Sequence, residues 1–216
     1  KFLFDTFFHE HIFYFSLRIL KKIFFDRGYK FLNIEETTSK GGSLRLTLVK
    51  NYKFNQTKYT NDKLNEIIKK EKDNGIFDIK TYKNFNKYMK ELKKKLNEKL
   101  KKIVKKQIIG FGASIATTTI IHYFKLEKKI NYLLDDNKLL NNYFTPDSKI
   151  KIINTDKFFK NNGKYKYILI LAIRYKNIII NRHFKNFRNK TIISIHPKIK
   201  FEKVKKKFNS NFSRLV

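Results

Sequence analysis

The 216-residue sequence contains no cysteine and no tryptophan, one methionine, two prolines and seven glycines. Without cysteine, this stretch can form no disulfide, no thiolate zinc site and no cysteine nucleophile, which is compatible with a reducing compartment. Long apolar runs are also missing, because the longest, at residues 167–173 and 178–180, are too short to cross a bilayer. There is no secretory signal. We therefore expect a cytoplasmic protein with no membrane partner.

The sequence also lacks an initiator methionine, since it opens at Lys1 and its one methionine is Met89. Its first residues already have the character of the inside of a folded unit. The length suffices for one large domain or two small ones. We expect a fragment of a longer protein.

Acidic residues are scarce, with 18 against 50 lysines and arginines and a formal charge of +32. Such a balance normally points to nucleic acid or an anionic surface. Only seven of the basic residues are arginine, however, and arginine is the side chain that nucleic-acid readers favour. Lysine, asparagine, isoleucine, phenylalanine and tyrosine, whose codons are A/T-rich, supply more than half of the chain. The charge is therefore a weak indication of a partner, and we expect no specific nucleic acid.

The N-terminal half predicts a helix and a strand pair. Apolar residues recur at helical spacing over residues 16–27, with Ser16 as a cap and Gly28 as a left-handed stop. Residues 29–36 and 43–48 have the composition and alternation of two antiparallel strands with one buried face. Further along, we expect a short helix at residues 64–70, ended by Gly75, and a long amphipathic helix over residues 82–103 with a lysine outer face.

From Gln107 onward, short apolar strands alternate with helices. The expected elements are a strand ending in a glycine turn at residues 108–114, a helix at 113–124, strands at 130–134, 150–153 and 167–171, a helix at 175–187, and a strand at 191–195. Such alternation implies right-handed crossovers and a parallel sheet covered on both faces. The fold class is therefore α/β, with a small Rossmann-like domain after residue 107 and part of another domain before residue 60.

The first candidate site is the turn at Gly110-x-Gly112. Glycines let the strand turn tightly and let backbone N–H groups at the helix start face a phosphate. An acid about twenty residues further on, as Asp135 or Asp136 is, suits a ribose hydroxyl. The third glycine of the dinucleotide fingerprint is missing, because Ile115 and Ala116 stand in its place. Ligand binding and a purely structural turn both stay open.

The second candidate site is Phe8-His9-Glu10-His11, which holds two of the five histidines. An imidazole can remove a proton from a weak carbon acid when a neighbouring group orients it. A surface turn, a buried structural histidine and a metal pair formed by His9 and His11 are the alternatives. The sequence nominates no third ligand, so we predict no metal site.

The other candidates are weaker. The segment from Thr37 to Ser43 could hold a phosphate through backbone amides, Lys40 and Ser43, or it could be an ordinary hairpin connection. His122, His183 and His196 are predicted to be structural or solvated. The sequence has no nucleophile-elbow serine, no P-loop and no carboxylate pair placed for glycoside chemistry.

Five blocks, in order and in spacing, resemble the C-terminal part of the S-adenosylmethionine-dependent C-methyltransferases of nucleotide-linked deoxysugars. The blocks are Phe4 to His11 with Tyr14-Phe15-Ser16, Thr38 to Leu46, Gly110 to Ser114 with Thr117-Thr118, Asp135-Asp136-Asn137 with Tyr143-x-Thr145-Pro146, and Leu171 to Tyr175. Together they cover nearly the whole chain, which makes them far more specific than the glycine turn alone.

The resemblance implies a three-part enzyme with an N-terminal zinc-binding segment, a methyl-donor domain and a Rossmann-like domain that helps to hold a nucleotide-linked keto-deoxysugar. In this chain, residues 1–60 would end the methyl-donor domain, residues 61–106 would be a helical linker, and residues 107–216 would be the Rossmann-like domain. The zinc and most of the S-adenosylmethionine site would then lie upstream, and the fragment alone is expected to be inactive.

The resemblance also assigns roles to residues. It implies that His11 is the general base, with Glu10 and His9 orienting it or stabilising an enolate, and that Gly110, Gly112, Ser114 and Asp136 contact the nucleotide sugar. Phe8 departs from the family, which usually has tyrosine there and so offers a further hydroxyl.

Two other functions remain as alternatives. The charge of +32 would suit a nucleic-acid-binding module. The glycine turn would suit a fragment of a dinucleotide-dependent oxidoreductase.

Overall fold

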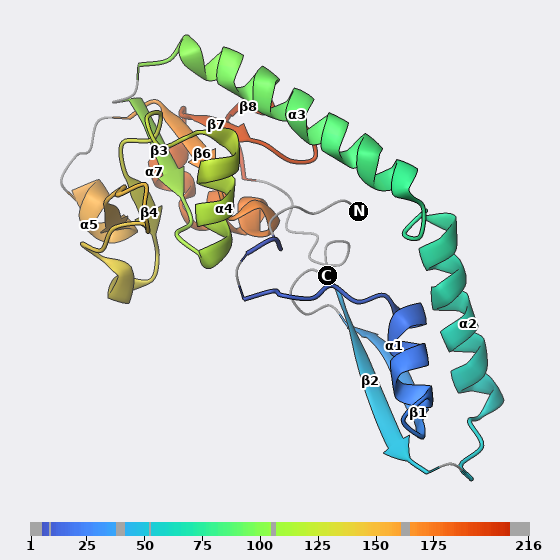
Figure 1. Cartoon of the computed structure of the whole chain (residues 1–216). Helices are drawn as coiled ribbons and strands as arrows, with labels where there is room; N and C mark the ends of the chain where they lie inside the picture. Colours follow the sequence, from blue (N-terminus) through green and yellow to red (C-terminus); the bar gives the residue numbers. More distant parts are fainter. Residues whose placement is uncertain are drawn as a thin grey trace. The chain divides into compact units, whose positions relative to one another are not determined.

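The computed structural model describes residues 6–8, 10–37, 42–51, 53–104, 107–160 and 165–207. The chain divides into two compact units. The first, Ile12–Phe85, is called here the hairpin unit. The second combines the described residues of Lys1–His11 with those of Asn86–Ser210 and is called the sheet unit. Figure 1 labels most of the helices and strands of both.

The hairpin unit opens with the helix that the sequence predicts. Helix α1, Leu17–Phe25, is capped by Ser16, whose Oγ accepts a hydrogen bond from the backbone N–H of Ile19 at 3.3 Å. Gly28 follows the helix with φ of 76°, which is the left-handed conformation expected of a glycine stop. Both predicted ends of this helix are confirmed.

The predicted antiparallel strand pair is also confirmed. Strands β1, Tyr29–Thr37, and β2, Ser43–Lys50, pair from Tyr29 opposite Lys50 to Thr37 opposite Ser43. The register shifts between Phe31 and Asn33. Such a bulge inserts one residue, so that Phe31 and Ile34, three positions apart, both enter the core of this unit. The core also takes Leu17 from α1 and two residues of the following helix.

Helix α2, Lys58–Asp73, is much longer than the predicted residues 64–70. Its first turns are polar and show no apolar periodicity in the sequence. In the structure, Thr60, Leu64 and Ile67 form a buried stripe at helical spacing. Thr57 caps the helix by accepting a hydrogen bond from the backbone N–H of Thr60 at 3.1 Å. Gly75 follows the helix with φ of 68°.

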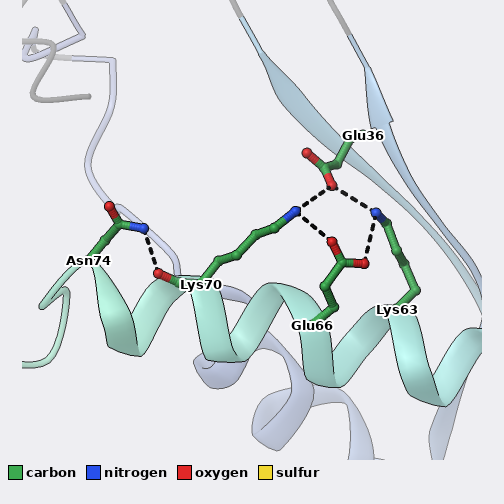
Figure 2. A network of polar contacts seen from close by, with 5 residues as sticks. All are labelled: Glu36, Lys63, Glu66, Lys70 and Asn74. Atoms are coloured by element: carbon green, nitrogen blue, oxygen red, sulfur yellow. Dashed lines mark hydrogen bonds and ion pairs between the residues drawn. The ribbon is translucent and has the colours of Figure 1, made fainter.

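A network of ion pairs ties the end of β1 to α2 (Figure 2). Lys63 lies 2.9 Å from the Glu36 carboxylate and 3.3 Å from that of Glu66, while Lys70 lies 2.6 Å from Glu66 and 3.6 Å from Glu36. The hydrogen bond from Lys63 lowers the pKa of Glu36, and that from Lys70 lowers the pKa of Glu66. The four charges alternate in sign, which reduces the lysine repulsion along this helix face.

Most of α3, Ile79–Lys101, belongs to the sheet unit. It is the long amphipathic helix that the sequence predicts. Its buried residues, Met89, Leu92, Leu96 and Leu100, recur at three and four positions. Asn97 donates a hydrogen bond to the backbone carbonyl of Phe124 at 2.8 Å, so α3 lies against the end of helix α4.

A six-stranded sheet in the order β5-β4-β3-β6-β7-β8 follows. Neighbouring strands from β5 to β7 are parallel, and β8 is antiparallel to β7. The strands are β3 (Ile108–Phe111), β4 (Leu133–Asp135), β5 (Ile152–Asn154), β6 (Tyr167–Ile170), β7 (Thr191–Ser194) and β8 (Lys200–Lys203). The chain is therefore an α/β protein with a mainly parallel sheet and a separate antiparallel pair.

Both faces of the sheet are buried, as predicted. On one face, alternate residues such as Ile109, Phe111 and Ile170 pack against Phe158, Ile180 and Phe187 of the helices α5 (Thr155–Lys160), α6 (Lys176–Arg182) and α7 (Phe184–Phe187). On the other face, Ile108 and Leu133 are fully buried, as are Ile120 and Phe124 of α4 (Ile115–Phe124).

Three features of the sheet unit differ from the sequence prediction. Helix α5 and strand β8 were not predicted, because each is too short for a clear periodic pattern. The helix predicted over residues 175–187 is broken into the short helix η4 (Ile173–Tyr175), α6 and α7, with His183 at the last break. Within the described residues, no helix has both the length and the hydrophobicity needed to span a membrane.

Candidate functional site

The carboxyl edge of the sheet has its switch point between β3 and β6. These strands are parallel neighbours, and after them the chain runs in opposite directions, through α4 toward β4 and through α6 toward β7. The backbone N–H of Leu171 donates to the carbonyl of Phe111 at 2.9 Å, and Gly112 and Ala172 still lie side by side one residue further on. In open parallel sheets, ligands bind in the crevice outside such a point.

Both glycines of the predicted turn have a packing role. Gly112 has φ of 102°, and a Cβ built on it would lie 2.7 Å from Cβ and 2.9 Å from N of Ala172, in the turn after β6. A Cβ on Gly110 would lie 2.4 Å from Cδ2 of Leu133. Any side chain at these positions would meet neighbouring atoms. The close approach of the turns after β3 and β6 therefore explains why a glycine stands at position 112.

Asp135, the last residue of β4, accepts hydrogen bonds from the backbone at the glycine turn and after β4. Its Oδ2 accepts a hydrogen bond from the backbone N–H of Ala113 at 2.8 Å, and its Oδ1 accepts one from Asn137 at 2.8 Å. A backbone N–H at such a turn is the group that faces a pyrophosphate in dinucleotide-binding domains. Here an internal carboxylate already satisfies it, which does not favour a diphosphate at this N–H.

Asp136 contacts helix α6 and the residue that ends it. Its Oδ2 lies 2.8 Å from the guanidinium of Arg182, and its Oδ1 lies 2.8 Å from Nε2 of His183. Burial alone would raise the pKa of Asp136, but hydrogen bonds with Arg182, His183 and Thr155 outweigh it and hold this pKa below its ordinary range. A ligand hydroxyl at Asp136 would have to share the carboxylate with these partners.

His183 is buried, as a structural role requires, and its ring packs among aromatic side chains. The ring centroid lies 5.2 Å from that of Phe111, 5.6 Å from that of Phe187 and 6.3 Å from that of Phe159. His122, another histidine predicted to be structural, lies with Nδ1 3.1 Å from Glu127 near the end of α4.

Ser114 stands at the N-terminus of α4 and is exposed. Its side chain makes no capping hydrogen bond, and Oγ lies 3.3 Å from Oγ1 of Thr117. Thr117 is buried and donates to the carbonyl of Gly112 at 2.9 Å, which secures the turn to the helix.

The described residues of Thr6 to His11, called here the histidine segment, lie against α4. The hydroxyl of Thr119 donates to the backbone carbonyl of Phe7 at 2.6 Å, a contact between residues 112 positions apart. Nδ1 of His11 lies 2.8 Å from the carbonyl of Thr6, and the rings of Phe8 and His11 have centroids 3.9 Å apart. Glu10 and His11 are exposed, so His11 is not a buried structural histidine.

The structure therefore brings two of the predicted sites onto one helix. Ser114 precedes α4, and Thr119 holds the histidine segment. The five positions between Ser114 and Thr119 correspond to about 7 Å along the helix axis. Ser43 begins β2 in the hairpin unit, while His9 and Lys40 lie outside the described residues. No group of three or more histidine, cysteine or acidic side chains that could hold a metal occurs in the described part of the chain.

Sequence reasoning did not single out Thr119 or Arg182. Neither belongs to a motif, and both are recognised only by what they contact. Asp135 was considered only as an alternative to Asp136 for a ribose contact, and its hydrogen bond to Ala113 depends on how β4 lies beside β3.

The strand order and the polar carboxyl edge define a doubly wound α/β domain of the ligand-binding kind. Comparison with known proteins is more specific: residues 38–197 match the model of the C-methyltransferase C-terminal domain, and the chain belongs to that family. The predicted family is thereby confirmed. The chain is also similar to the C-methyltransferase NovU of Streptomyces niveus, with 24% identity over 189 residues. The match covers 86% of this chain and 44% of NovU, so the chain spans less than half of that relative.

Replacing Gly112 by alanine should destabilise the sheet unit by about 2–4 kcal/mol, because the new Cβ meets Ala172 and the backbone conformation is strained. Gly42→Ala is the matched control, since Gly42 has φ of 114° but nothing within 4 Å of its Cβ position. Hydrogen exchange read by mass spectrometry should show faster exchange of β3 in the first variant and a smaller effect, confined to β2, in the second. Equal effects would rule out the contact with Ala172 as the cause.

Asp136→Asn should lower the free energy of unfolding at pH 7 by about 1–3 kcal/mol, since the Arg182 guanidinium loses its anionic partner and His183 loses its contact with a carboxylate. Because the pKa of Asp136 is lowered in the folded state, its contribution is present above the unfolded-state pKa of about 4 and lost as the pH falls through the folded-state pKa. Urea unfolding from pH 7 to pH 2.5 should show the two proteins converging at acid pH. A difference that persists unchanged at pH 2.5 would contradict an ionic role.

Proposed function

We propose that this chain is the C-terminal part of an S-adenosylmethionine-dependent C-methyltransferase that acts on a nucleotide-linked keto-deoxysugar. The family match and the similarity to NovU support the reaction class. The observation that carries the proposal is the contact of the histidine segment with α4, the helix that begins at the glycine turn. This contact supports placing a candidate base at the helix that begins at the glycine turn.

The chemistry assigned to this chain is removal of a proton. A C–H bond is no nucleophile by itself, but the proton beside a ketone is acidic enough for a neutral imidazole to remove. His11 takes this proton, the C–H electron pair becomes an enolate, and that carbon can then attack an electrophilic methyl group. Glu10 and His9 are assigned to orienting the base or stabilising the enolate oxygen.

The glycine turn of the sheet unit is not a favoured place for the methyl donor. The glycine turn after β3 has its Ala113 N–H bonded to the Asp135 carboxylate. We therefore place S-adenosylmethionine, which supplies the electrophilic methyl, and the zinc-binding segment implied by the family in parts of the whole protein outside this chain. Residues 1–60 are proposed to end the donor domain and residues 61–106 to link it to the Rossmann-like domain.

The sugar nucleotide is assigned to the carboxyl edge. Ser114 is the strongest predicted contact, because it is exposed at the N-terminus of α4, where backbone dipoles favour an anionic group. Gly110 and Gly112 are buried and packed against Leu133 and Ala172, and they remain predictions for the nucleotide sugar. Asp136 would share its carboxylate, and Lys40 and Ser43 remain predictions for a phosphate.

His11→Ala in the complete enzyme should abolish methyl transfer and slow the exchange of the substrate's ring C–H with deuterium by at least about 100-fold. The exchange is measured by NMR without methyl donor, so that it reports the proton step alone. His122→Ala is the control, because it removes a histidine of the same unit that pairs with Glu127. Unchanged exchange in His11→Ala would remove His11 from the base role.

The alternative functions differ in what they bind. The occupied Ala113 N–H disfavours a dinucleotide, so NAD(H) should not raise the melting temperature of this chain. With a formal charge of +32, the chain should bind duplex DNA weakly at about 50 mM salt and lose it by about 200 mM. Fluorescence anisotropy and thermal unfolding measure both. Tight, sequence-dependent binding above that salt concentration, or clear stabilisation by NAD(H), would favour the corresponding alternative.

A further inference from the structure

The contact between His11 and its own segment selects one form of the imidazole ring. Nδ1 lies 2.8 Å from the backbone carbonyl of Thr6. A carbonyl oxygen can only accept a hydrogen bond, so the neutral ring must carry its proton on Nδ1. The lone pair is then on Nε2, the nitrogen that a general base of this orientation presents to a substrate.

A second contact holds the residue that follows this carbonyl. Thr119 donates to the carbonyl of Phe7, the residue after Thr6, at 2.6 Å, which is within the normal range for a hydroxyl donor. Peptide units are planar, so holding the Phe7 carbonyl holds the plane of the Phe7–Phe8 peptide, and only the two backbone dihedrals of Phe7 separate this plane from the Thr6 carbonyl. The ring of Phe8, with its centroid 3.9 Å from that of His11, restricts the imidazole from one face.

Helix α4 is a rigid support for this hydroxyl. Ile120, Ile121 and Phe124 have no exposed surface, and the carbonyl of Phe124 accepts a hydrogen bond from Asn97 of α3. Thr117 joins the helix to the carbonyl of Gly112 at 2.9 Å. The histidine segment, which is mostly exposed, is therefore held by a helix that is anchored on both sides of Thr119.

We propose that Thr119 is a positioning residue for the His11 base, acting through the backbone of Thr6 and Phe7 to hold the imidazole in its Nδ1–H tautomer. The inference rests on the proposed function for its catalytic consequence. The tautomer itself is a property of this chain and can be measured without substrate or methyl donor.

The test uses Thr119→Val, which keeps the shape of the side chain and removes the hydroxyl, and Thr119→Ser, which restores a hydroxyl. Thr118→Val is the matched control, because it makes the same change at the neighbouring position of α4, for which the described residues show no hydrogen bond to the histidine segment. Long-range ¹H–¹⁵N spectra of this chain at about pH 8.5, where histidines are neutral, report which ring nitrogen carries the proton.

We expect the Nδ1–H form of His11 in the unaltered chain, in Thr119→Ser and in Thr118→Val, and a mixture of both tautomers in Thr119→Val. In the complete enzyme, Thr119→Val should slow the exchange of the substrate's ring C–H about five- to tenfold, the effect of one lost hydrogen bond of about 1 kcal/mol. Thr119→Ser should recover most of that rate, which a loss of packing alone would not allow.

The outcomes separate this inference from the proposed function. If Thr119→Val leaves the tautomer and the exchange rate as they are in Thr118→Val, Thr119 is not a positioning residue. If Thr119→Val changes the tautomer but His11→Ala leaves exchange intact, the proposed base is wrong, and the catalytic part of this inference fails with it. If Thr119→Val perturbs the helix, Thr119→Ser still tests the inference, because loss of the Nδ1–H form in a variant that keeps the hydroxyl would contradict it.

Discussion

The carboxyl edge of the sheet depends on the close approach of two turns, the one after β3 and the one after β6. Gly112 and Ala172 meet there at a separation that leaves no space for a Cβ on the glycine. This contact determines where α4 begins, because Thr117 bonds to the Gly112 carbonyl. The position of α4 in turn determines where Thr119 can hold the histidine segment. The position of the proposed base thus depends on a steric contact between Gly112 and Ala172, neither of which is a catalytic residue.

The few acidic residues are placed where they serve more than one partner. Asp135 accepts from two backbone N–H groups, and Asp136 contacts both Arg182 and His183. In the hairpin unit, Glu71 accepts from the N–H groups of the first two residues of α1, Leu17 and Arg18, at 2.6 and 3.2 Å. In a chain with so large an excess of lysine, exposed positive charge is common, whereas internal anions are scarce. The acids accordingly join elements that lie far apart in the sequence.

Much of the fold could be predicted from local pattern. The alternation of strands and helices after Gln107 gave the parallel sheet, and Ser16 and Gly28 marked the boundaries of α1. The breaks that were missed depend on tertiary contacts. The helix predicted over residues 175–187 is interrupted at His183, whose side chain turns to Asp136 and three aromatic rings rather than continuing an amphipathic stripe.

The candidate site was predictable to a lesser degree. The glycine turn and the histidine block are visible in the sequence, but nothing local indicates that Thr119 contacts Phe7 or that Asp135 already occupies the N–H of Ala113. The Asp135 contact depends on which strands become neighbours, and the Thr119 contact depends on how the first residues of the chain pack against α4.

The course of the chain has a further consequence. The described residues of Lys1–His11 belong to the sheet unit, the next 74 residues form the hairpin unit, and the chain returns to the sheet unit at Asn86. The sheet unit is thus discontinuous in sequence, and its histidine segment is tethered by an entire inserted domain. Closing a loop of this length costs about 4 kcal/mol of chain entropy. While the hairpin unit is unfolded, the few contacts of the histidine segment with α4 do not offset this cost. A single proteolytic cut between β2 and α2 would therefore leave the histidine segment joined to the rest of the sheet unit by noncovalent contacts alone, among them the core of the hairpin unit.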